Sequence, residues 1–375
     1  MTQKAVKARQ SNMELLRIVA MLMIITLHYL DKGNVLGDFA AASTLNQCLV
    51  WILEAFCYVA VNVYVLISGY FLVQSKFTFK KLFVLWVQVL FYSWLIAGIF
   101  FLGGWAPAEA KTLYELFFVA FPVTAGHYWF ATIYILLFAV SPFLNATIAK
   151  MSKGQHKACI AVLLVIFSLW NTVLPFTIPV TDNEGMDIAW FVCIYLIAAY
   201  IRKYPECVNR KTYVYVFGYA GWSVMVFSAG IALLWIDGIV GKLGGYATNF
   251  YAYNSLPVLV ASVYLFMAFL KIEIKGGGIG RFINLIAGAT FGVYLIHEHR
   301  YIRYLWQQWL HVTDAVNEPW LLLHLLGSIL AVFAVCTCIE LVRKWLFGLI
   351  TNRKWFNNIF AKFAKAEAKI NGDAE

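Results

Sequence analysis

Two ionisable residues, Arg17 and His28, lie in the first long apolar segment of the chain. Ionisable side chains are rare inside membranes, because a charged residue at the centre of a span costs roughly 2.5–3.5 kcal/mol on insertion. Eleven helical residues make about three turns, so both side chains project from one face, about 16 Å apart along the axis. Arginine stays cationic, whereas histidine exchanges a proton near neutral pH. The pair predicts that Arg17 binds an anionic group at the inner side of the membrane and that His28 transfers a proton deeper in the membrane.

The elements that position this pair are predicted to be membrane helices. The chain has 375 residues, of which 62% are hydrophobic and 13% are charged, whereas soluble proteins have about 25% charged residues. The apolar residues fall into blocks of the length that crosses about 30 Å of hydrocarbon. We therefore predict an all-α integral membrane protein with about ten transmembrane helices and both termini in the cytoplasm. The expected spans are residues 14–31, 48–73, 82–103, 127–148, 158–178, 187–202, 212–236, 250–270, 282–299 and 320–342.

The net charge of +10 follows this topology. With the N-terminus inside, 24 of the 29 Lys and Arg residues fall on the cytoplasmic side, as the positive-inside rule requires. This alternation argues against nucleic acid as a partner. Residues 1–342 form the predicted transmembrane domain, and the basic, aromatic residues 343–375 are predicted to be an amphipathic tail on the inner leaflet. The seven cysteines show no metal-type spacing, so no metal site is expected.

A carboxylate in the second expected span, Glu54, is a candidate partner for His28. The two residues are expected at similar depth in the outer half of the membrane. A lone carboxylate there is costly unless it is paired. We therefore predict that Glu54 orients the His28 imidazole and shares in catalysis.

Polar and basic residues follow one another at the cytoplasmic end of the second span. They are Ser68, Tyr70, Lys76, Lys80 and Lys81. The lysines are expected at the same membrane face as Arg17, so a basic pocket for phosphate groups is geometrically possible. Ordinary lysines that set the membrane topology explain the pattern equally well.

Aromatic and basic residues mark the opposite face. Tyr128 and Trp129 open the fourth span, and His297 and Arg300 lie at the end of the ninth. An interfacial aromatic belt is one explanation. The other is a substrate site in which flat aromatic rings face sugar rings, and Arg300 and Arg303 bind a phosphate or acid group.

Four segments together resemble the acyltransferase-3 family of bacterial membrane O-acyltransferases. Arg17, ten further residues and His28 are similar to the family's Arg-x10-His signature. The other three segments, in the family's order, are Ser68-Gly69-Tyr70, Tyr128-Trp129-Phe130 with Ser141-Pro142, and Gly292 to His297. The resemblance extends over most of the chain.

The resemblance implies transfer of an acyl group, usually acetyl, from acyl-CoA to a hydroxyl of a cell-surface or exported glycan. His28 would then be the general base or would itself accept the acyl group, and Arg17 would help to hold the donor. The implied partners are acyl-CoA, a glycan or lipid-linked sugar, and the lipid bilayer of the bacterial cytoplasmic membrane. Acyl-CoA would be a co-substrate, with no resident cofactor.

A transporter or flippase for a lipid-linked sugar or a small anion is the competing class. Ten spans and an intramembrane Arg/His pair are compatible with it. An enzyme should consume acetyl-CoA or be thermally stabilised by it, whereas a transporter should ignore CoA.

Overall fold

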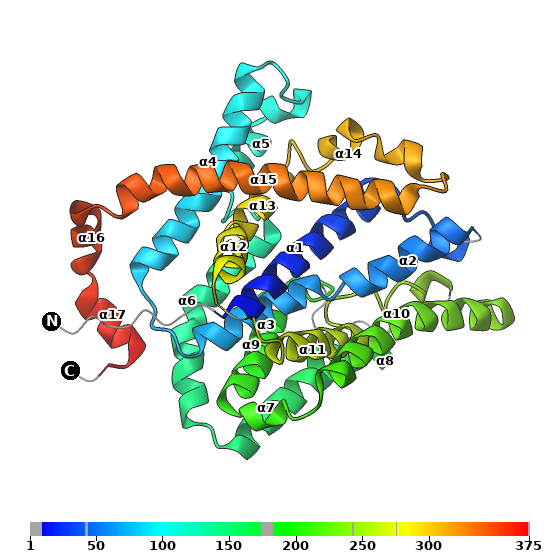
Figure 1. Ribbon diagram of the computed structural model, residues 1–375, viewed down its shortest axis with the longest axis horizontal. Helices are drawn as coiled ribbons and strands as arrows, with labels where there is room; N and C mark the ends of the chain where they lie inside the picture. Colours follow the sequence, from blue (N-terminus) through cyan, green and yellow to red (C-terminus); the bar gives the residue numbers. More distant parts are fainter. Residues whose placement is uncertain (1–9, 42–43, 174–182, 242–243, 275, 374–375) are drawn as a thin grey trace.

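The computed structural model describes residues 10–41, 44–173, 183–241, 244–274 and 276–373, and every regular element among them is helical (Figure 1). The α-helices are α1 (Ser11–Lys32), α2 (Leu45–Cys57), α3 (Ala60–Leu72), α4 (Phe79–Leu102), α5 (Leu113–Ala120), α6 (Trp129–Lys150), α7 (Lys153–Leu164), α8 (Trp170–Val173), α9 (Ile188–Lys203), α10 (Thr212–Val240), α11 (Leu256–Leu270), α12 (Gly278–Ala287), α13 (Thr290–His297), α14 (Leu305–Trp309), α15 (Leu321–Thr351), α16 (Lys354–Ala361) and α17 (Ala364–Asn371). A π-helical segment, Val165–Leu169, joins α7 to α8. Short 3-10 helices are Phe39–Ala41, Ala108–Lys111, Pro205–Cys207, Gly244–Tyr246 and Val312–Ala315.

Within the described ranges, eight helical segments are long and apolar enough to cross a membrane. They are Ser11–Lys32, Leu45–Leu72, Phe79–Leu102, Trp129–Lys150, Lys153–Val173, Thr212–Val240, Gly278–His297 and Leu321–Thr351. The chain is therefore an all-α, multi-pass membrane protein, as predicted.

Two of the ten expected spans, 187–202 and 250–270, coincide with the shorter helices α9 and α11, which have 16 and 15 residues. Helices of this length cover about 22–24 Å, less than the ~30 Å of a typical hydrocarbon core. The count of ten spans and the cytoplasmic position of the termini stay predictions. The expected span 158–178 reaches Val173, and its last residues lie outside the described ones.

Helix α1 lies in the middle of the bundle, where it contacts α2, α3, α11, α12, α13 and α15 (Figure 1). Leu16, Ala20 and Ile25 on its packed faces have no exposed surface. Because lipid chains are as apolar as these side chains, close packing between helices stabilises such a bundle more than transfer from lipid does. The residues of α1 are thus held by neighbours on nearly every side.

A break between α12 and α13 positions the end of the candidate span Gly278–His297. Gly288 ends α12, and Lys344 of α15 donates a hydrogen bond from Nζ to the Gly288 carbonyl at 3.2 Å. Helix α13 starts at Thr290 and ends at His297, after which Glu298 leaves the helix. The short α13 contacts α1, α4 and α15, so His297 and Glu298 reach the last turn of α1.

A buried ion pair joins α15 to α4 beneath α13. Arg343 donates from Nε and Nη2 to the two oxygens of Glu340 at 2.8 and 2.6 Å. Tyr92 and Gln88 of α4 donate to the same carboxylate at 2.6 and 3.2 Å. A Cβ on Gly292 would lie 2.3 Å from this carboxyl group. The glycine thus lets α13 pack directly on the ion pair.

The predicted boundary between residues 342 and 343 falls inside α15, because the helix continues to Thr351. The separate C-terminal segment consists of α16 and α17, beside the start of α4 (Figure 1). Lys76 pairs with Asp373 at 2.6 Å, and the Phe79 backbone N–H donates to Glu367 at 2.7 Å. The tail therefore docks on the loop before α4 through polar contacts.

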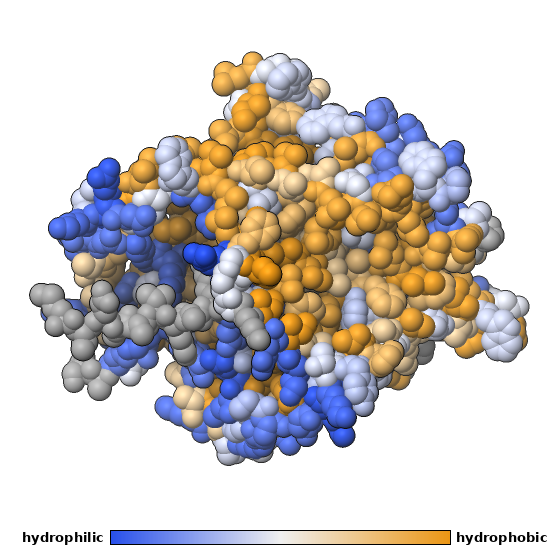
Figure 2. All heavy atoms as spheres, viewed as in Figure 1, coloured by the Kyte–Doolittle hydropathy of each residue, from blue (hydrophilic) through white to orange (hydrophobic). Residues whose placement is uncertain are grey.

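Figure 2 shows one face of the molecule in the view of Figure 1. Apolar side chains cover its middle, and hydrophilic ones gather toward the left and the bottom, where α16, α17 and α7 lie in Figure 1. Large apolar residues are widely exposed; Phe217, Trp235 and Leu323 are 72%, 71% and 73% exposed. Such a surface suits contact with lipid rather than water.

Replacing Arg343 with Met should leave the Glu340 carboxylate buried without its cation. Loss of one partner of a buried pair costs about 3–5 kcal/mol, so the Arg343→Met protein should unfold at a clearly lower temperature in detergent. The exposed Arg353 provides a matched control, and Arg353→Met should change little. The double variant Glu340→Gln, Arg343→Met should recover most of the loss. Wild-type stability of the single Arg343→Met protein would contradict this role.

Candidate active site

The last turn of α1 presents one face to a cavity of about 560 Å³. Leu27, His28, Asp31 and Lys32 lie on this face, because residues three and four apart project from the same side of a helix. The rest of the lining comes from other segments: Leu36, Trp51, Glu54, Tyr58, Trp129, Glu184, Met186, Thr248, Tyr251, Tyr253, Glu298 and Arg303. The cavity volume is typical of small-molecule sites.

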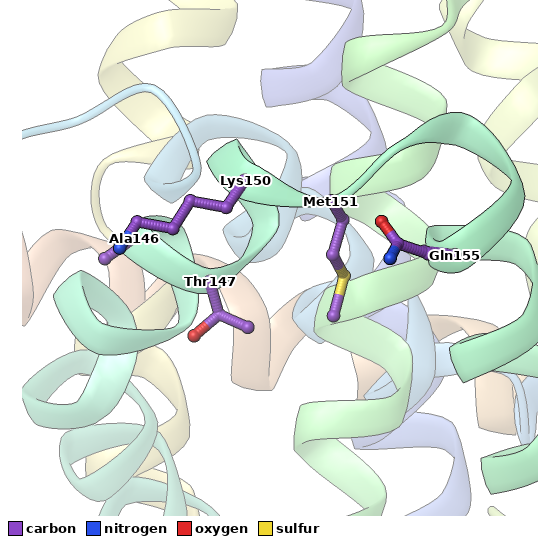
Figure 3. A pocket seen from close by; sticks show the side chains of 5 residues that line it. All are labelled: Ala146, Thr147, Lys150, Met151 and Gln155. Atoms are coloured by element: carbon purple, nitrogen blue, oxygen red, sulfur yellow. The ribbon is translucent and has the colours of Figure 1, made fainter.

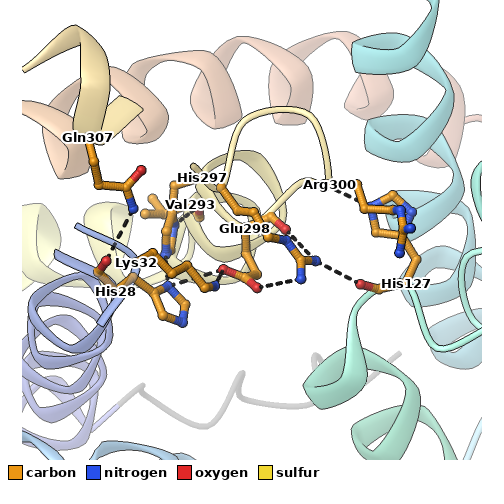
Figure 4. Close-up of polar contacts among 9 residues, drawn as sticks. His28, Lys32, His127, Val293, His297, Glu298, Arg300 and Gln307 are labelled. Carbon is orange, nitrogen blue, oxygen red and sulfur yellow. Dashed lines mark hydrogen bonds and ion pairs between the residues drawn. The ribbon is translucent and has the colours of Figure 1, made fainter. Parts of the chain in front are cut away.

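The His28 imidazole is held from one side (Figure 4). Its Nδ1 lies 3.0 Å from His297 Nε2 and 3.3 Å from Glu298 Oε2. Gln307 of the α14 region donates from Nε2 to the His28 carbonyl at 3.1 Å. The end of α13 and α14, both distant from α1 in sequence, thus fix this residue at the cavity wall.

The hydrogen-bond network assigns the tautomers of both histidines. His297 Nδ1 lies 2.6 Å from the Val293 carbonyl, which only accepts, so this nitrogen carries the hydrogen. The Nε2 of a neutral His297 is then an acceptor, and the hydrogen shared with His28 must come from His28 Nδ1. The lone pair of His28 Nε2 is therefore free, which is the state a base or nucleophile requires.

Glu298 lies at the centre of a charge cluster beside His28. Its carboxylate forms an ion pair with Lys32 and a second one with Arg303, whose Nη1 lies 3.4 Å from Oε1. Arg303 also donates from Nη2 to the Glu298 carbonyl at 3.1 Å. A carboxylate 3.3 Å from His28 Nδ1 would stabilise an imidazolium if Nε2 took up a proton.

The turn before α6 supports this cluster from the other side. Arg303 donates to the His127 carbonyl at 3.1 Å, and the Arg300 backbone N–H donates to His127 Nε2 at 3.2 Å (Figure 4). Burial, together with the Arg303 charge, lowers the pKa of His127 to about 3, so its ring is neutral and Nε2 accepts. The Arg300 guanidinium is bound elsewhere, in an ion pair with Glu115.

The comparison with protein families identifies the chain. The acyltransferase-3 family model, described as an acyltransferase domain, matches residues 10–341. The chain belongs to the acyltransferase-3 family. It is therefore a membrane acyltransferase for groups other than aminoacyl groups, not the transporter or flippase considered as the alternative. No curated protein and no solved structure matches it.

The acyltransferase holds Glu54 in the same cavity as His28 but gives the imidazole a different partner. Among the described residues, the contacts of the His28 ring go to His297 and Glu298. Glu54 is 5% exposed, and its Oε2 has no hydrogen-bond partner there. The predicted Glu54–His28 pairing is therefore wrong, because Glu298 reaches the ring from the end of α13.

Arg17 is not among the residues that line the His28 cavity. Its Nη1 pairs with Glu14 at 3.2 Å, and the Tyr64 hydroxyl donates to its carbonyl at 2.8 Å. The guanidinium is partly exposed, three turns before His28. Arg17 and His28 therefore lie at different positions along α1, as their spacing in the sequence indicates.

Two of the three predicted cytoplasmic lysines, Lys76 and Lys80, contact the C-terminal tail. Lys76 pairs with Asp373, and Lys80 donates to the Asn357 side chain at 2.6 Å. Lys81 donates to the Lys76 carbonyl at 3.3 Å. The binding of phosphate groups by these lysines stays a prediction.

Ser68 and Tyr70 take part in helix packing. Ser68 donates to the Tyr64 carbonyl at 2.8 Å, and the Tyr70 hydroxyl accepts from Arg202 at 2.8 Å. A Cβ on Gly69 would lie 2.9 Å from that of Ala198, so this glycine permits the close approach of α3 and α9.

The aromatic and basic candidates at the other face divide between the cavity and its support. Trp129 lines the cavity, and His297 contacts His28 directly. Tyr128 is fully buried against the His127 ring, with centroids 4.2 Å apart. Arg300, bound to Glu115, holds the surrounding turns.

Sequence reasoning missed Glu298 and Lys32 as site residues, and it gave Arg303 a phosphate or acid group as its partner, whereas the structure pairs it with Glu298. Lys32 follows His28 by one helical turn, and Glu298 directly follows His297, so local spacing contained a signal for both. Arg303 follows Glu298 by five residues, and the turn after α13 brings its guanidinium back to that carboxylate.

A second hollow, of about 500 Å³, lies at the turn between α6 and α7 (Figure 3). Its lining residues are Ala146, Thr147, Lys150, Met151 and Gln155. Lys150 is the single ionisable residue among them, and an ammonium ion is a poor base at neutral pH. This hollow therefore offers no counterpart to His28.

Replacing Glu298 with Gln should lower kcat roughly 10–100-fold, the usual effect of losing a group that orients a functional side chain. The KM for the acyl donor should stay near its wild-type value, because Glu298 acts through His28. Acyl transfer by the purified protein measures both constants. Glu115→Gln removes a carboxylate that pairs with Arg300 outside the cavity lining, and it should have a much smaller effect. Equal losses in the two variants would contradict the role of Glu298.

Proposed function

We propose that this acyltransferase moves an acetyl group from acetyl-CoA to a hydroxyl of a cell-surface or exported glycan, with His28 as the general base. The observation that carries the proposal is the free Nε2 of His28 at the wall of a 560 Å³ cavity, opposite an Nδ1 held by His297 and Glu298. Family membership supplies the acyl-transfer chemistry. The acceptor class rests on the aromatic lining of that cavity.

The reaction assigned to His28 is addition followed by elimination. Nε2 takes the proton of the acceptor hydroxyl while its oxygen attacks the thioester carbonyl carbon, which gives a tetrahedral intermediate. The C–S bond then breaks, and the imidazolium returns the proton to the departing CoA thiolate. The products are an ester and free CoA, and histidine ends as it began.

Two neighbours of His28 assist these steps. Glu298 stabilises the imidazolium through Nδ1. Lys32, one turn from His28 and lining the same cavity, offers N–H donors to the oxyanion of the intermediate, where such donors contribute several kcal/mol of stabilisation, roughly 2.7–4 kcal/mol for one donor. The site needs neither a metal nor a resident cofactor for this chemistry, and acyl-CoA acts as co-substrate.

The donor and the acceptor are proposed to arrive from opposite ends of α1. With the N-terminus in the cytoplasm of a bacterial cell, Arg17 lies toward the side where acyl-CoA is made, and it would attract the CoA phosphates. The acyl end of the donor would then extend about 16 Å along the helix to His28. The glycan or lipid-linked sugar would enter the cavity from the outer side.

The His28→Ala variant should lose about 10²–10⁴-fold in acyl transfer, the usual contribution of a general base, while it stays folded. Release of CoA thiol from acetyl-CoA, followed with purified protein and a saccharide acceptor, measures the loss. Thermal unfolding serves as the folding control. Retained transfer in a folded His28→Ala protein would rule out the base role.

Direct transfer can be separated from an acyl-histidine route by use of the donor alone. With labelled acetyl-CoA and no acceptor, a base leaves the protein unlabelled, whereas a nucleophile accumulates acyl-imidazole. We expect no label on His28. Label that is stable to washing and absent from His28→Ala would contradict direct transfer.

The Arg17→Ala variant should raise the KM for acetyl-CoA about tenfold, as for loss of roughly 1.4 kcal/mol of binding, with kcat little changed. Glu14 pairs with Arg17, and the single substitution would leave its buried carboxylate unpaired. The measurement is therefore made on the double variant Glu14→Gln, Arg17→Ala. Glu14→Gln alone is the control. A fall in kcat at unchanged KM would contradict donor binding by Arg17.

A further inference from the structure

One wall of the His28 cavity consists of three aromatic rings from different segments. The rings of Tyr58 and Tyr253 have centroids 4.9 Å apart, and Trp129 stacks on Tyr253 at 5.9 Å with an interplanar angle of 27°. All three residues line the cavity. Stacked rings of this kind present a flat apolar face, which complements the C–H face of a pyranose ring.

The same wall carries a carboxylate that lacks a partner. Trp51, Glu54 and Tyr58 are spaced three and four residues apart at the end of α2, and all three line the cavity. Glu54 is 5% exposed, and no described group donates to its Oε2. A buried oxygen of this kind calls for a donor, and a hydroxyl of a bound molecule is the donor that the cavity has room for.

The charge of the cavity limits what that molecule is. Leaving Glu184 aside, three carboxylic residues line it, Asp31, Glu54 and Glu298, against two fixed cations, Lys32 and Arg303. Both cations pair with Glu298. Arg300, which the sequence suggested for an acidic group, pairs with Glu115. A second anion near Glu54 would therefore meet repulsion without a matching cation.

We propose that the space between Glu54 and the rings of Tyr58, Tyr253 and Trp129 binds a neutral saccharide and rejects uronates and sugar phosphates. Glu54 accepts hydrogen bonds from the sugar hydroxyls, and the rings pack on the sugar face. This rests on the proposed function in one respect, since it makes the bound sugar the acceptor. The binding site itself does not depend on the acyl donor.

The test is a binding measurement without acyl-CoA, on the full chain in lipid nanodiscs free of sugar-based detergent. Matched pairs of methyl hexopyranosides and methyl uronosides, in the gluco and galacto series, differ at one carbon only. Trp51 and Trp129 line the cavity, so tryptophan emission reports occupancy. We expect at least one neutral sugar to bind and its uronoside to bind at least about tenfold more weakly, the change that roughly 1.4 kcal/mol of repulsion produces.

The Glu54→Gln variant shows whether Glu54 causes this selectivity. The amide keeps the shape of the side chain but removes its charge, so the preference for neutral sugar over uronoside should fall toward one. Glu206→Gln changes an exposed carboxylate that pairs with Lys153 outside the cavity lining, and it should keep the wild-type preference. An alkyl glycoside of the preferred sugar distinguishes a lipid-linked source from a free saccharide, because only the former gains affinity from the chain.

Binding of uronosides as tight as that of neutral sugars, or no saccharide binding by any of these probes, would overturn the proposal. An unchanged preference in Glu54→Gln would overturn the role of Glu54. CoA thiol release is measured separately. Selective saccharide binding without thiol release leaves this site standing and contradicts the proposed function, whereas thiol release without selective binding does the reverse.

Discussion

The hydrogen bond from His297 Nδ1 to the Val293 carbonyl, at 2.6 Å, determines the chemistry of the site. It makes the opposite nitrogen of His297 an acceptor and so makes His28 Nδ1 the donor across the 3.0 Å contact. The reactive lone pair is thereby directed away from the protein contacts. Because the acceptor is a backbone carbonyl within α13, the assignment depends on the helix itself.

The same short helix explains how a charge cluster persists inside a membrane protein. The break at Gly288 lets α13 end beside the last turn of α1, and Glu298 then meets both Lys32 and Arg303. Each cation reduces the cost of the buried carboxylate. The carboxylate in turn lies 3.3 Å from His28 Nδ1, where its negative charge would stabilise an imidazolium.

The sequence predicted the membrane fold, and it predicted the separation of Arg17 and His28 along α1. Both predictions are correct because both depend on local properties. Apolar length predicts helices, and helical spacing separates Arg17 from His28 along one helix. The predicted pairing of Glu54 with His28 was wrong, because a similar depth in the membrane does not determine whether Glu54 or Glu298 contacts the His28 imidazole. The break before α13 brings Glu298 there, and this break is a tertiary feature. The boundary at residue 343 stays a prediction, and α15 continues through it to Thr351 because Glu340 compensates the buried Arg343.

In the resting protein, His28 carries its hydrogen on Nδ1, and its Nε2 has no hydrogen. Solid-state nitrogen NMR of the histidine-labelled protein in lipid reads this directly, because protonated and unprotonated ring nitrogens resonate far apart. The chain has seven histidines, and subtraction of the His28→Asn spectrum isolates the His28 signals. We expect a protonated Nδ1 and an unprotonated Nε2 near neutral pH. A protonated Nε2 with a bare Nδ1 would contradict it.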